Sequence, residues 1–316
     1  MENIKGLELA RKYYEEFGGP MIHEKFAEIE EKLAIGLVGS GSECFGYDDV
    51  FSHDHDFEPG FCIFIPDEDV IDEKTAFNLQ REYMKLPKEY LGFERQMMNP
   101  VGGNRHGVIR ISDFYKSKCG KKDGNLSVND WLMVPEYSLA EAVNGEVFKD
   151  EFGEFSGIRE SISHYPDDVR LKKLAGYLLL MAQSGQYNFM RCVDRNELAA
   201  AQVSAFNFVD AGMHVIFLLN GRYMPYYKWG FRALKDLKRL GNMYDSFEFL
   251  ISSDNEKKNA QMKSEMIEDI AALIIRELKN DGLTQAVCNE LEKHAYSVND
   301  YIQEGNLRNM DIFAGV

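Results

Sequence analysis

The pattern of hydrophobic and polar positions at the start of the chain is that of amphipathic helices. In residues 21–34, Ile22, Phe26 and Ile29 lie three or four positions apart and so share one face of a helix. Residues 4–17 show the same character. We therefore predict two helices, over residues 4–17 and 21–34.

Further along the chain, short apolar runs alternate with helical stretches. The run 61–65 is apolar throughout and is followed by Pro66, as expected for a buried strand. Residues 107–112 predict another strand, and residues 72–85 and 113–120 predict helices. This mixture is typical of an α/β or α+β domain.

From about residue 145 the pattern becomes mainly helical. Two short apolar-aromatic pieces in residues 145–155 predict a β-hairpin that joins the halves. Pro166 and the acids after it mark a helix start, because proline fits the first turn and acids favour the positive end of the helix dipole. Helices are expected at about 167–184, 193–219, 226–239, 257–280 and 283–296. The predicted fold class is α+β, with a mixed sheet and helices in residues 1–145 and an all-α helical bundle in residues 146–316.

The charge balance limits the classes of partner. The chain of 316 residues carries 36 Lys and Arg against 52 Asp and Glu, a formal net charge of −16. Proteins that follow an extended nucleic acid usually present a basic stripe, and this sequence shows none. The lysines at positions 116, 118, 121 and 122 are interpreted as a solvated helix end. Small-molecule or protein substrates are favoured, and the end of a tRNA stays an open alternative.

Cysteine usage and hydropathy predict a cytoplasmic location. The five cysteines form no Cys-x-x-Cys pair, which argues against a disulfide framework and a zinc ribbon. The first residues contain no apolar signal core, and no uncharged apolar run is long enough to cross a bilayer. We expect no membrane association.

The most distinctive stretch is residues 36–56, in which a small-residue turn precedes two alternate aspartates. Gly39 and Gly41 lack the Cβ atoms that would block the backbone, so that amide N–H groups can face an anion. Alternate residues of an extended segment share a face, so Asp54 and Asp56 point the same way. Two carboxylates on one face suit Mg²⁺, which takes its other ligands from water and substrate phosphates. The stretch therefore predicts a site for a metal and a nucleotide.

This stretch resembles the signature of the polymerase-β-like nucleotidyltransferase superfamily, which is Gly-Ser, a spacer and then Asp-x-Asp. Its fuller form looks like an uncharacterised bacterial branch, a domain of unknown function with a C-terminal helical domain. Four later segments look like the same branch; they are residues 129–132, 145–148, 165–169 and 220–229. The resemblance implies a nucleotidyltransferase fold in the first half and no established substrate.

The resemblance also implies roles for individual residues. Asp54 and Asp56 would be the metal ligands for Mg²⁺ or Mn²⁺ and the catalytic acids. Gly41 and Ser42 would hold the β- and γ-phosphates of a nucleoside triphosphate through backbone N–H groups and the Ser42 hydroxyl. The whole turn is assigned to nucleotide binding, as Gly39, Ser40, Gly41, Ser42 and Glu43. The alternative is an ordinary turn followed by solvated acids.

One feature departs from the superfamily pattern. In most members the Asp-x-Asp lies directly on a strand, whereas here residues 57–60 intervene before the apolar run. Pro59 removes a donor from the strand ladder, which predicts a bulge or break before the strand resumes. Asp48 and Asp49 lie close by in sequence and compete as possible ligands.

Further side chains are candidates to support the two aspartates. Asp113 is expected to supply a third, catalytic carboxylate at the end of a strand, although an aspartate before a helix is commonly an N-cap. Glu43 and Glu94 are the alternatives to it. His53 and His55 are interpreted as hydrogen-bonding support for the aspartates rather than as zinc ligands.

Cations in the helical half are candidates for binding the triphosphate. Lys228 and Arg232 are four residues apart and share a helix face, and Arg191 follows an aromatic segment. These three are assigned to nucleotide binding. The structural alternative is that Tyr223 and Trp229 pack the bundle while Lys228 extends to water.

The leading hypothesis is a Mg²⁺-dependent nucleotidyltransferase that moves a nucleoside monophosphate from a nucleoside triphosphate to a hydroxyl of a small-molecule acceptor. Analogy with aminoglycoside and lincosamide nucleotidyltransferases suggests a small polyol acceptor, and the acidic composition would suit a cationic one. Two alternatives stay open. One is a nucleotide-binding or regulatory module without transfer, and the other is a transferase that acts on a protein or a tRNA.

Overall fold

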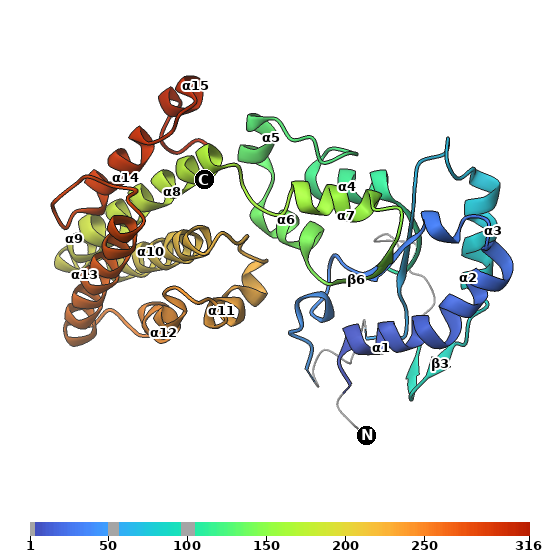
Figure 1. Ribbon diagram of the computed structural model, residues 1–316. Coiled ribbons are helices and arrows are strands. Elements are labelled where there is room, and N and C mark those ends of the chain that lie inside the picture. The colour runs from blue at the N-terminus through green and yellow to red at the C-terminus, as the bar shows by residue number, and fades with distance from the viewer. Residues whose placement is uncertain (1–3, 50–56, 96–104) are drawn as a thin grey trace. The chain divides into compact units, whose positions relative to one another are not determined.

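The computed structural model describes residues 4–49, 57–95 and 105–316 (Figure 1). Its secondary structure is mixed, so the α+β prediction is confirmed at that level. The chain forms two compact units. The first consists of Met1–Leu126 and Val134–Ser163, and the second of Ser127–Met133 and His164–Val316.

A four-stranded mixed sheet organises the first unit. Its strands are β1 (Ala34–Leu37), β2 (Cys62–Ile65), β5 (Gly107–Arg110) and β6 (Glu146–Asp150). The order is β5-β2-β1-β6, with β1 antiparallel to β2 and β6 and with β2 parallel to β5. The end of β1 therefore lies at the same edge of the sheet as the starts of β2 and β5. A separate short ladder pairs β3 (Glu89–Tyr90) with β4 (Phe93–Glu94).

One face of the sheet packs against the helices of the N-terminal half. They are α1 (Gly6–Tyr13), the π-helical segment Tyr14–Gly18, α2 (Gly19–Phe26) and α3 (Glu73–Tyr83). Ile35 and Ile63 point to this side and join a buried cluster with Tyr13 and Leu79. Because successive strand residues alternate between faces, Phe64 points to the other side.

The other face carries a second layer of helices. They are α4 (Ile111–Cys119), α6 (Glu136–Val143) and α7 (Glu154–Ser161). The Phe64 ring stacks on Phe155 at 4.1 Å and meets Phe114 edge-on at 5.2 Å. These aromatic contacts fix α4 and α7 against β2.

Two expectations for the first unit are wrong in detail. The predicted hairpin at 145–155 is one strand, Glu146–Asp150, followed by helix α7, because β6 pairs with β1 instead of with its own neighbour. Both elements belong to the first compact unit, which continues to Ser163. The predicted helix 21–34 ends at Phe26, since Ala34 begins a fully buried strand.

The second unit is helical. Its elements are α5 (Val128–Met133), α8 (Asp167–Met181), the π-helical segment Ala182–Phe189, α9 (Met190–Asp194), α10 (Leu198–Leu219), α11 (Tyr227–Lys235), α12 (Tyr244–Ser252), α13 (Lys257–Asn280), α14 (Leu291–Asp300) and α15 (Gly305–Asn309). Helix α10 packs against α8, α9, α11 and α12. Of the described residues, α10 alone has the length and apolar composition of a membrane span, and 67% of its most apolar window is buried inside the unit. Packing thus accounts for its apolar character.

The helix predictions in the second unit differ in accuracy. The prediction for 257–280 matches α13, and that for 193–219 is interrupted at Asn196, whose φ is +59°. The prediction for 283–296 is wrong at its start, because α14 begins only at Leu291.

Candidate functional site

The turn after β1 requires glycine at two positions. Gly39 has φ +105° and Gly41 has φ +125°, a region that residues with a Cβ rarely adopt. A Cβ on Gly41 would lie 2.0 Å from Nη2 of Arg105, so there is no space for one. The chain then enters a 3₁₀ turn, Glu43–Phe45, at Ser42. The glycines of the sequence motif therefore build a tight bend at the edge of the sheet.

The bend leaves backbone donors open. Among the described residues, the N–H groups of Gly41, Ser42 and Glu43 have no hydrogen-bond acceptor. The Ser42 side chain makes no capping bond either. Successive open N–H groups beside a glycine turn are a common way for a backbone to bind an anion.

Arg105 places a guanidinium directly on the turn. It lies just before β5, and its Nη2 donates to the Ser40 carbonyl at 2.8 Å. The same nitrogen donates to the carboxylate of Glu43, whose residue is only 6% exposed. Glu43 thus holds the Arg105 guanidinium next to Gly41. Glu43, which the sequence assigned to the turn, therefore positions a cation there.

Lys118 brings a second cation to the same turn. Its Nζ donates to Ser40 Oγ at 3.2 Å and to Glu141 Oε2 at 2.5 Å. Ser40 Oγ in turn donates to Glu141 Oε2 at 2.8 Å. Two cation–carboxylate pairs, Arg105–Glu43 and Lys118–Glu141, therefore meet at Ser40.

The connection between α6 and β6 fastens the turn. The Asn144 side chain accepts from Gly39 N at 2.8 Å and donates to Gly39 O at 2.7 Å. Gly145 N donates to Cys44 O at 2.8 Å. The sequence interpretation missed Asn144, Glu141, Arg105 and the role of Lys118. The only available signal was that a family-like segment begins at Gly145.

The two thiols near the turn are buried, which disfavours the thiolate form. Burial raises the pKa of Cys62 to about 12 and that of Cys44 well above its usual range. Cys44 Sγ lies 3.7 Å from Ser40 O, and Cys62 Sγ lies 3.1 Å from Arg105 O. Both remain protonated near neutral pH and fill the space beneath the turn.

Asp54 and Asp56, with His53 and His55, lie outside the described residues. The chain is described again from Phe57. A Cβ built on Gly6 would lie 2.5 Å from Glu43 Cβ and 3.2 Å from Phe57 Cε2. The chain therefore returns beside Glu43, at the edge of the sheet that carries the turn.

Asp48, a competing ligand by sequence, has a structural role. It is 3% exposed and accepts from Gly6 N at 2.8 Å. Lys5 Nζ lies 3.6 Å from its other carboxylate oxygen. The carboxylate thus neutralises the positive end of helix α1.

The structure does not bring Asp113 to the turn. Asp113 lies in the first turn of α4, after the end of β5, and this is the opposite edge of the sheet from Gly39. It lines a groove of about 450 Å³ with Phe77, Gln80 and Arg110. Because α4 runs back along the strand, Lys118 reaches the turn, about 7.5 Å further along the helix. The N-cap alternative is also wrong, since Arg110 occupies that position.

The described part of the chain does not by itself form a metal centre. In residues 4–49, 57–95 and 105–316, no three His, Cys, Asp or Glu side chains are grouped so as to hold an ion. The two carboxylates nearest the turn, Glu43 and Glu141, are paired with cations.

The three candidate cations of the helical unit lie on two different helices, α11 and α9. Lys228 Nζ lies 5.0 Å and Arg232 Cζ 5.6 Å from the Trp229 ring centroid, so α11 gathers them on one aromatic ring. Arg191 stacks on Tyr187 at 4.3 Å and belongs to α9, which precedes the start of α10. Helix α11 instead packs against the second half of α10. The structure thus brings Lys228 and Arg232 together and leaves Arg191 apart.

Comparison with known proteins adds one finding. Residues 131–230 match the model of a family described as Domain of unknown function (DUF4037). The matched part contains Glu141 and Asn144, which hold the turn, and also Lys228 and Trp229, but not the turn itself. No curated protein and no solved structure is significantly similar to the chain.

Proposed function

We propose that the protein is a nucleotidyltransferase that transfers a nucleoside monophosphate from a nucleoside triphosphate to a hydroxyl of a small molecule. The observation that best supports this is the turn Gly39–Ser42. Open backbone N–H groups there are flanked by Arg105 and Lys118, which meet at Ser40. Such a combination suits a polyphosphate, because its oxygens accept from backbone donors and from cations.

In this proposal the two cations exchange partners when the nucleotide binds. Arg105 and Lys118 now pair with Glu43 and Glu141, and their side chains are 28% and 15% exposed. Phosphate oxygens carry more charge than a carboxylate and would compete for both cations. The cations would then offset the charge of the leaving pyrophosphate.

Mg²⁺ or Mn²⁺ completes the proposal, with Asp54 and Asp56 as its ligands. Their carboxylates are hard oxygen donors in alternate positions, which suits either ion. The segment that carries them ends at Phe57, beside Glu43. When bound, the metal would stabilise negative charge on the transferred phosphoryl group. A nucleotidyltransferase-like arrangement of the sheet is part of this proposal.

One observation favours a second candidate, a nucleotide-binding module without transfer. Asp113 lies at the other edge of the sheet, and Glu43 and Glu141 are engaged by cations. Among the described residues, the turn therefore has no uncommitted carboxylate that could accept the proton of the attacking hydroxyl. A protein or tRNA acceptor remains the third candidate.

Incubation of the full chain with α-labelled nucleoside triphosphates and Mg²⁺ tests these candidates. We expect nucleotide binding and pyrophosphate release, with release falling at least about a hundredfold in Asp54→Asn and Asp56→Asn, because the metal would be lost. Both variants should keep the thermal stability of the wild type. Asp69→Asn, which changes an exposed acid elsewhere in the first unit, is the matched control.

The outcomes separate the three candidates. Binding without pyrophosphate release would support the module, and label on a macromolecule in a cell lysate would support a protein or tRNA acceptor. Failure to bind any nucleoside triphosphate would contradict the proposal as a whole.

A further inference from the structure

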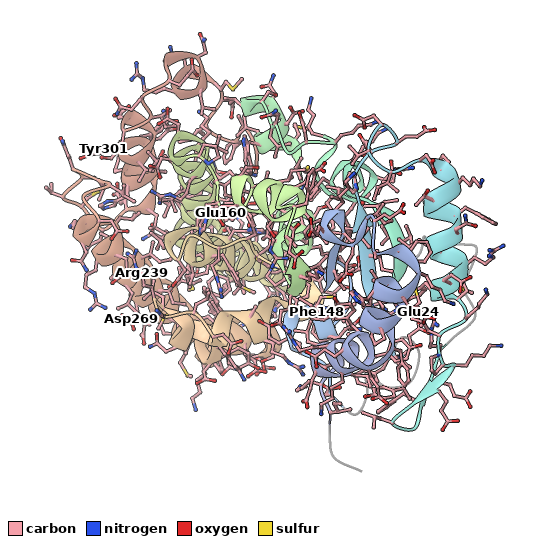
Figure 2. All side chains as sticks on the ribbon, turned by 45° about the vertical axis from the view of Figure 1, so that its right-hand side comes forward. Glu24, Phe148, Glu160, Arg239, Asp269 and Tyr301 are labelled. Atoms are coloured by element: carbon pink, nitrogen blue, oxygen red, sulfur yellow. The ribbon has the colours of Figure 1, made fainter. Side chains whose placement is uncertain are left out.

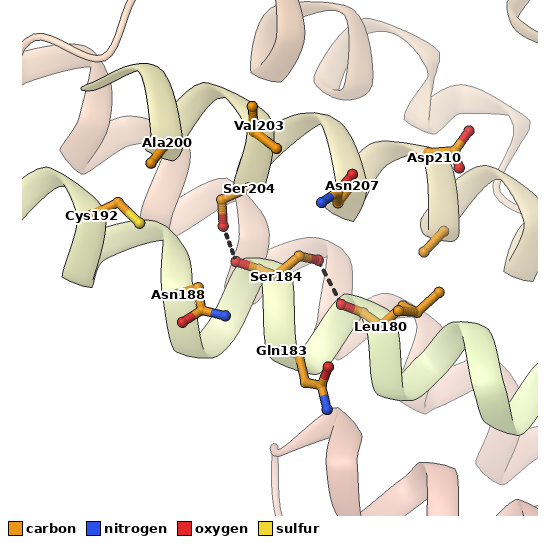
Figure 3. Close-up of a pocket in the computed structure, with 11 residues that line it drawn as sticks. Leu180, Gln183, Ser184, Asn188, Cys192, Ala200, Val203, Ser204, Asn207 and Asp210 are labelled. Atoms are coloured by element: carbon orange, nitrogen blue, oxygen red, sulfur yellow. Dashed lines mark hydrogen bonds between the residues drawn. The ribbon is translucent and has the colours of Figure 1, made fainter. Parts of the chain in front are cut away.

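A groove of about 440 Å³ lies in the helical unit, along the π-helical segment Ala182–Phe189 and helix α10 (Figure 3). Its volume is in the range of small-molecule sites. All the residues that line it lie between Leu180 and Ala211, inside the second unit and inside the segment matched by the family model. It shares no residue with the turn after β1.

The floor of the groove is fixed by two serines. Ser204 Oγ donates to Ser184 O at 2.5 Å, and Ser184 Oγ donates to Leu180 O at 2.6 Å. Figure 3 shows the first bond joining α10 to the opposing helix and the second bond within that helix. Next to them, a Cβ on Gly185 would lie 2.3 Å from the Phe208 ring, so this ring occupies the space that a side chain at position 185 would need. The small side chains of Ser184 and Ser204 thus form the bottom of the groove without filling it.

The π-helical segment is itself unusual. It runs for eight residues, Ala182–Phe189, whereas π-helical turns are rare and are mostly single insertions near functional sites. The carbonyl of Ser184, inside this segment, accepts a hydrogen bond from Ser204 Oγ of α10. The serines and the wide turn therefore belong to one rigid arrangement.

Polar side chains form the rim. Gln183 and Asn188 come from one wall, and Asn207 and Asp210 come from α10. All four are exposed. Within the part of the chain that the structure describes, none of these four side chains has a hydrogen bond or ion pair with another residue. Each amide can donate and accept, and the carboxylate can only accept.

The charge of the groove restricts the ligand. Asp210 is the one charged residue of the lining, which contains no Lys, Arg or His. A phosphate or carboxylate would find no cation here, so an anionic ligand is disfavoured. Leu180 and Val203 add an apolar strip, and Val203 is 60% exposed.

We propose that this groove binds a small molecule that carries both hydroxyl groups and an ammonium group. The ammonium group pairs with Asp210, and the hydroxyl groups bond to the amides of Asn207 and Asn188. The carbon skeleton lies on Leu180 and Val203. Asn207 and Asp210 are three residues apart on α10 and so are neighbours on one helix face. This proposal stands independently of the proposed function.

Glucosamine and glucose form a matched pair of probes, because they differ only in an ammonium group in place of a hydroxyl. Saturation-transfer NMR on the full chain at slightly acidic pH, with titration of each sugar, measures both affinities. We expect the wild type to bind glucosamine about tenfold more tightly than glucose, as one charge-assisted hydrogen bond would provide. Asp210→Asn should remove this preference. Asn207→Ala should weaken both sugars by about threefold.

Asp269→Asn is the control, since Asp269 is an exposed acid on α13 outside the groove (Figure 2). It should leave both affinities unchanged. The proposal is overturned if neither sugar shows saturation transfer or if Asp210→Asn keeps the glucosamine preference. Equal loss of preference in Asp269→Asn would also overturn it, because binding would then follow net charge and not the groove.

Discussion

Two pairs of cations, one pair in each unit, have opposite surroundings. At the turn after β1, Arg105 and Lys118 pair with carboxylates and keep part of their side chains in solvent. In the helical unit, Lys172 and Lys263 are completely buried. Neither of these buried ammonium groups has a carboxylate within ion-pair distance in the described chain; both are bonded to uncharged oxygens.

The buried lysines connect distant segments. Lys172 Nζ donates to Met310 O at 2.8 Å and to Asn299 Oδ1 at 3.0 Å, and so holds the last residues of the chain to α8. Lys263 Nζ donates to Asn255 Oδ1 at 2.7 Å and to Ser253 O at 2.8 Å. Burial lowers the pKa of both ammonium groups. The hydrogen bonds of these two lysines therefore hold segments of the helical unit together.

The difference indicates which cations can take part in binding. A cation that faces solvent and pairs with a carboxylate can exchange that partner for a phosphate without losing its charge compensation. A buried cation held by carbonyl oxygens cannot turn away without leaving those oxygens unsatisfied. We therefore expect changes at Lys172 to affect stability and changes at Lys118 to affect affinity.

The largest effect is expected for Lys172→Ala. It removes the donor to Asn299 Oδ1 and to the Met310 carbonyl and creates a cavity at a completely buried position, so the free energy of unfolding of the helical unit should fall by about 2–4 kcal/mol. The two tryptophans, Trp131 and Trp229, both belong to this unit, so tryptophan fluorescence during urea unfolding reports on it alone. Lys228→Ala, at an exposed position, should change the value by less than about 0.5 kcal/mol. If Lys172→Ala and Lys228→Ala lowered the free energy of unfolding equally, the distinction between buried and exposed lysines would be contradicted.

A smaller effect, on affinity, is expected for Lys118→Met. It removes one of the two cations at Ser40, so the dissociation constant of a nucleoside triphosphate, measured by calorimetry, should rise about tenfold. The melting temperature should change little, because Glu141 is partly exposed and can be solvated. Lys116→Met is the matched control, since Lys116 is exposed on the same helix. An unchanged affinity in Lys118→Met would remove Lys118 from the site.

The features that could be predicted from the sequence are those that depend on residues close together along the chain. Gly39 and Gly41 were selected because they lack a Cβ; their positive φ values in the structure favour glycine as well, and this requirement is local. The bounds of α13 were likewise predictable from its own periodicity. Features of this kind depend on a few neighbouring residues.

The remaining features depend on long-range pairing. Whether residues 146–150 pair with their own neighbours or with β1 is decided by a strand more than a hundred residues earlier in the sequence. The approach of Lys118 to the turn could not be predicted for a related reason, because only the direction of β5 shows which end of α4 reaches the turn. The buried lysines gave no signal, since lysine on a helix usually extends to water.

The smallest effect is a pH dependence that distinguishes Lys263 from a surface lysine. Burial holds the pKa of Lys263 below its ordinary value of 10.5, so between the folded and unfolded pKa values the unfolded chain binds more protons. The stability contributed by this group therefore rises with pH across that window, which ends near 10.5. The unfolding free energy of the wild type minus that of Lys263→Met, from tryptophan fluorescence, should increase from neutral pH towards that limit. The same difference for Lys228→Met should stay flat, and tyrosine titration cancels in both. A flat or falling difference for Lys263 would mean that its ammonium group is solvated in the folded protein.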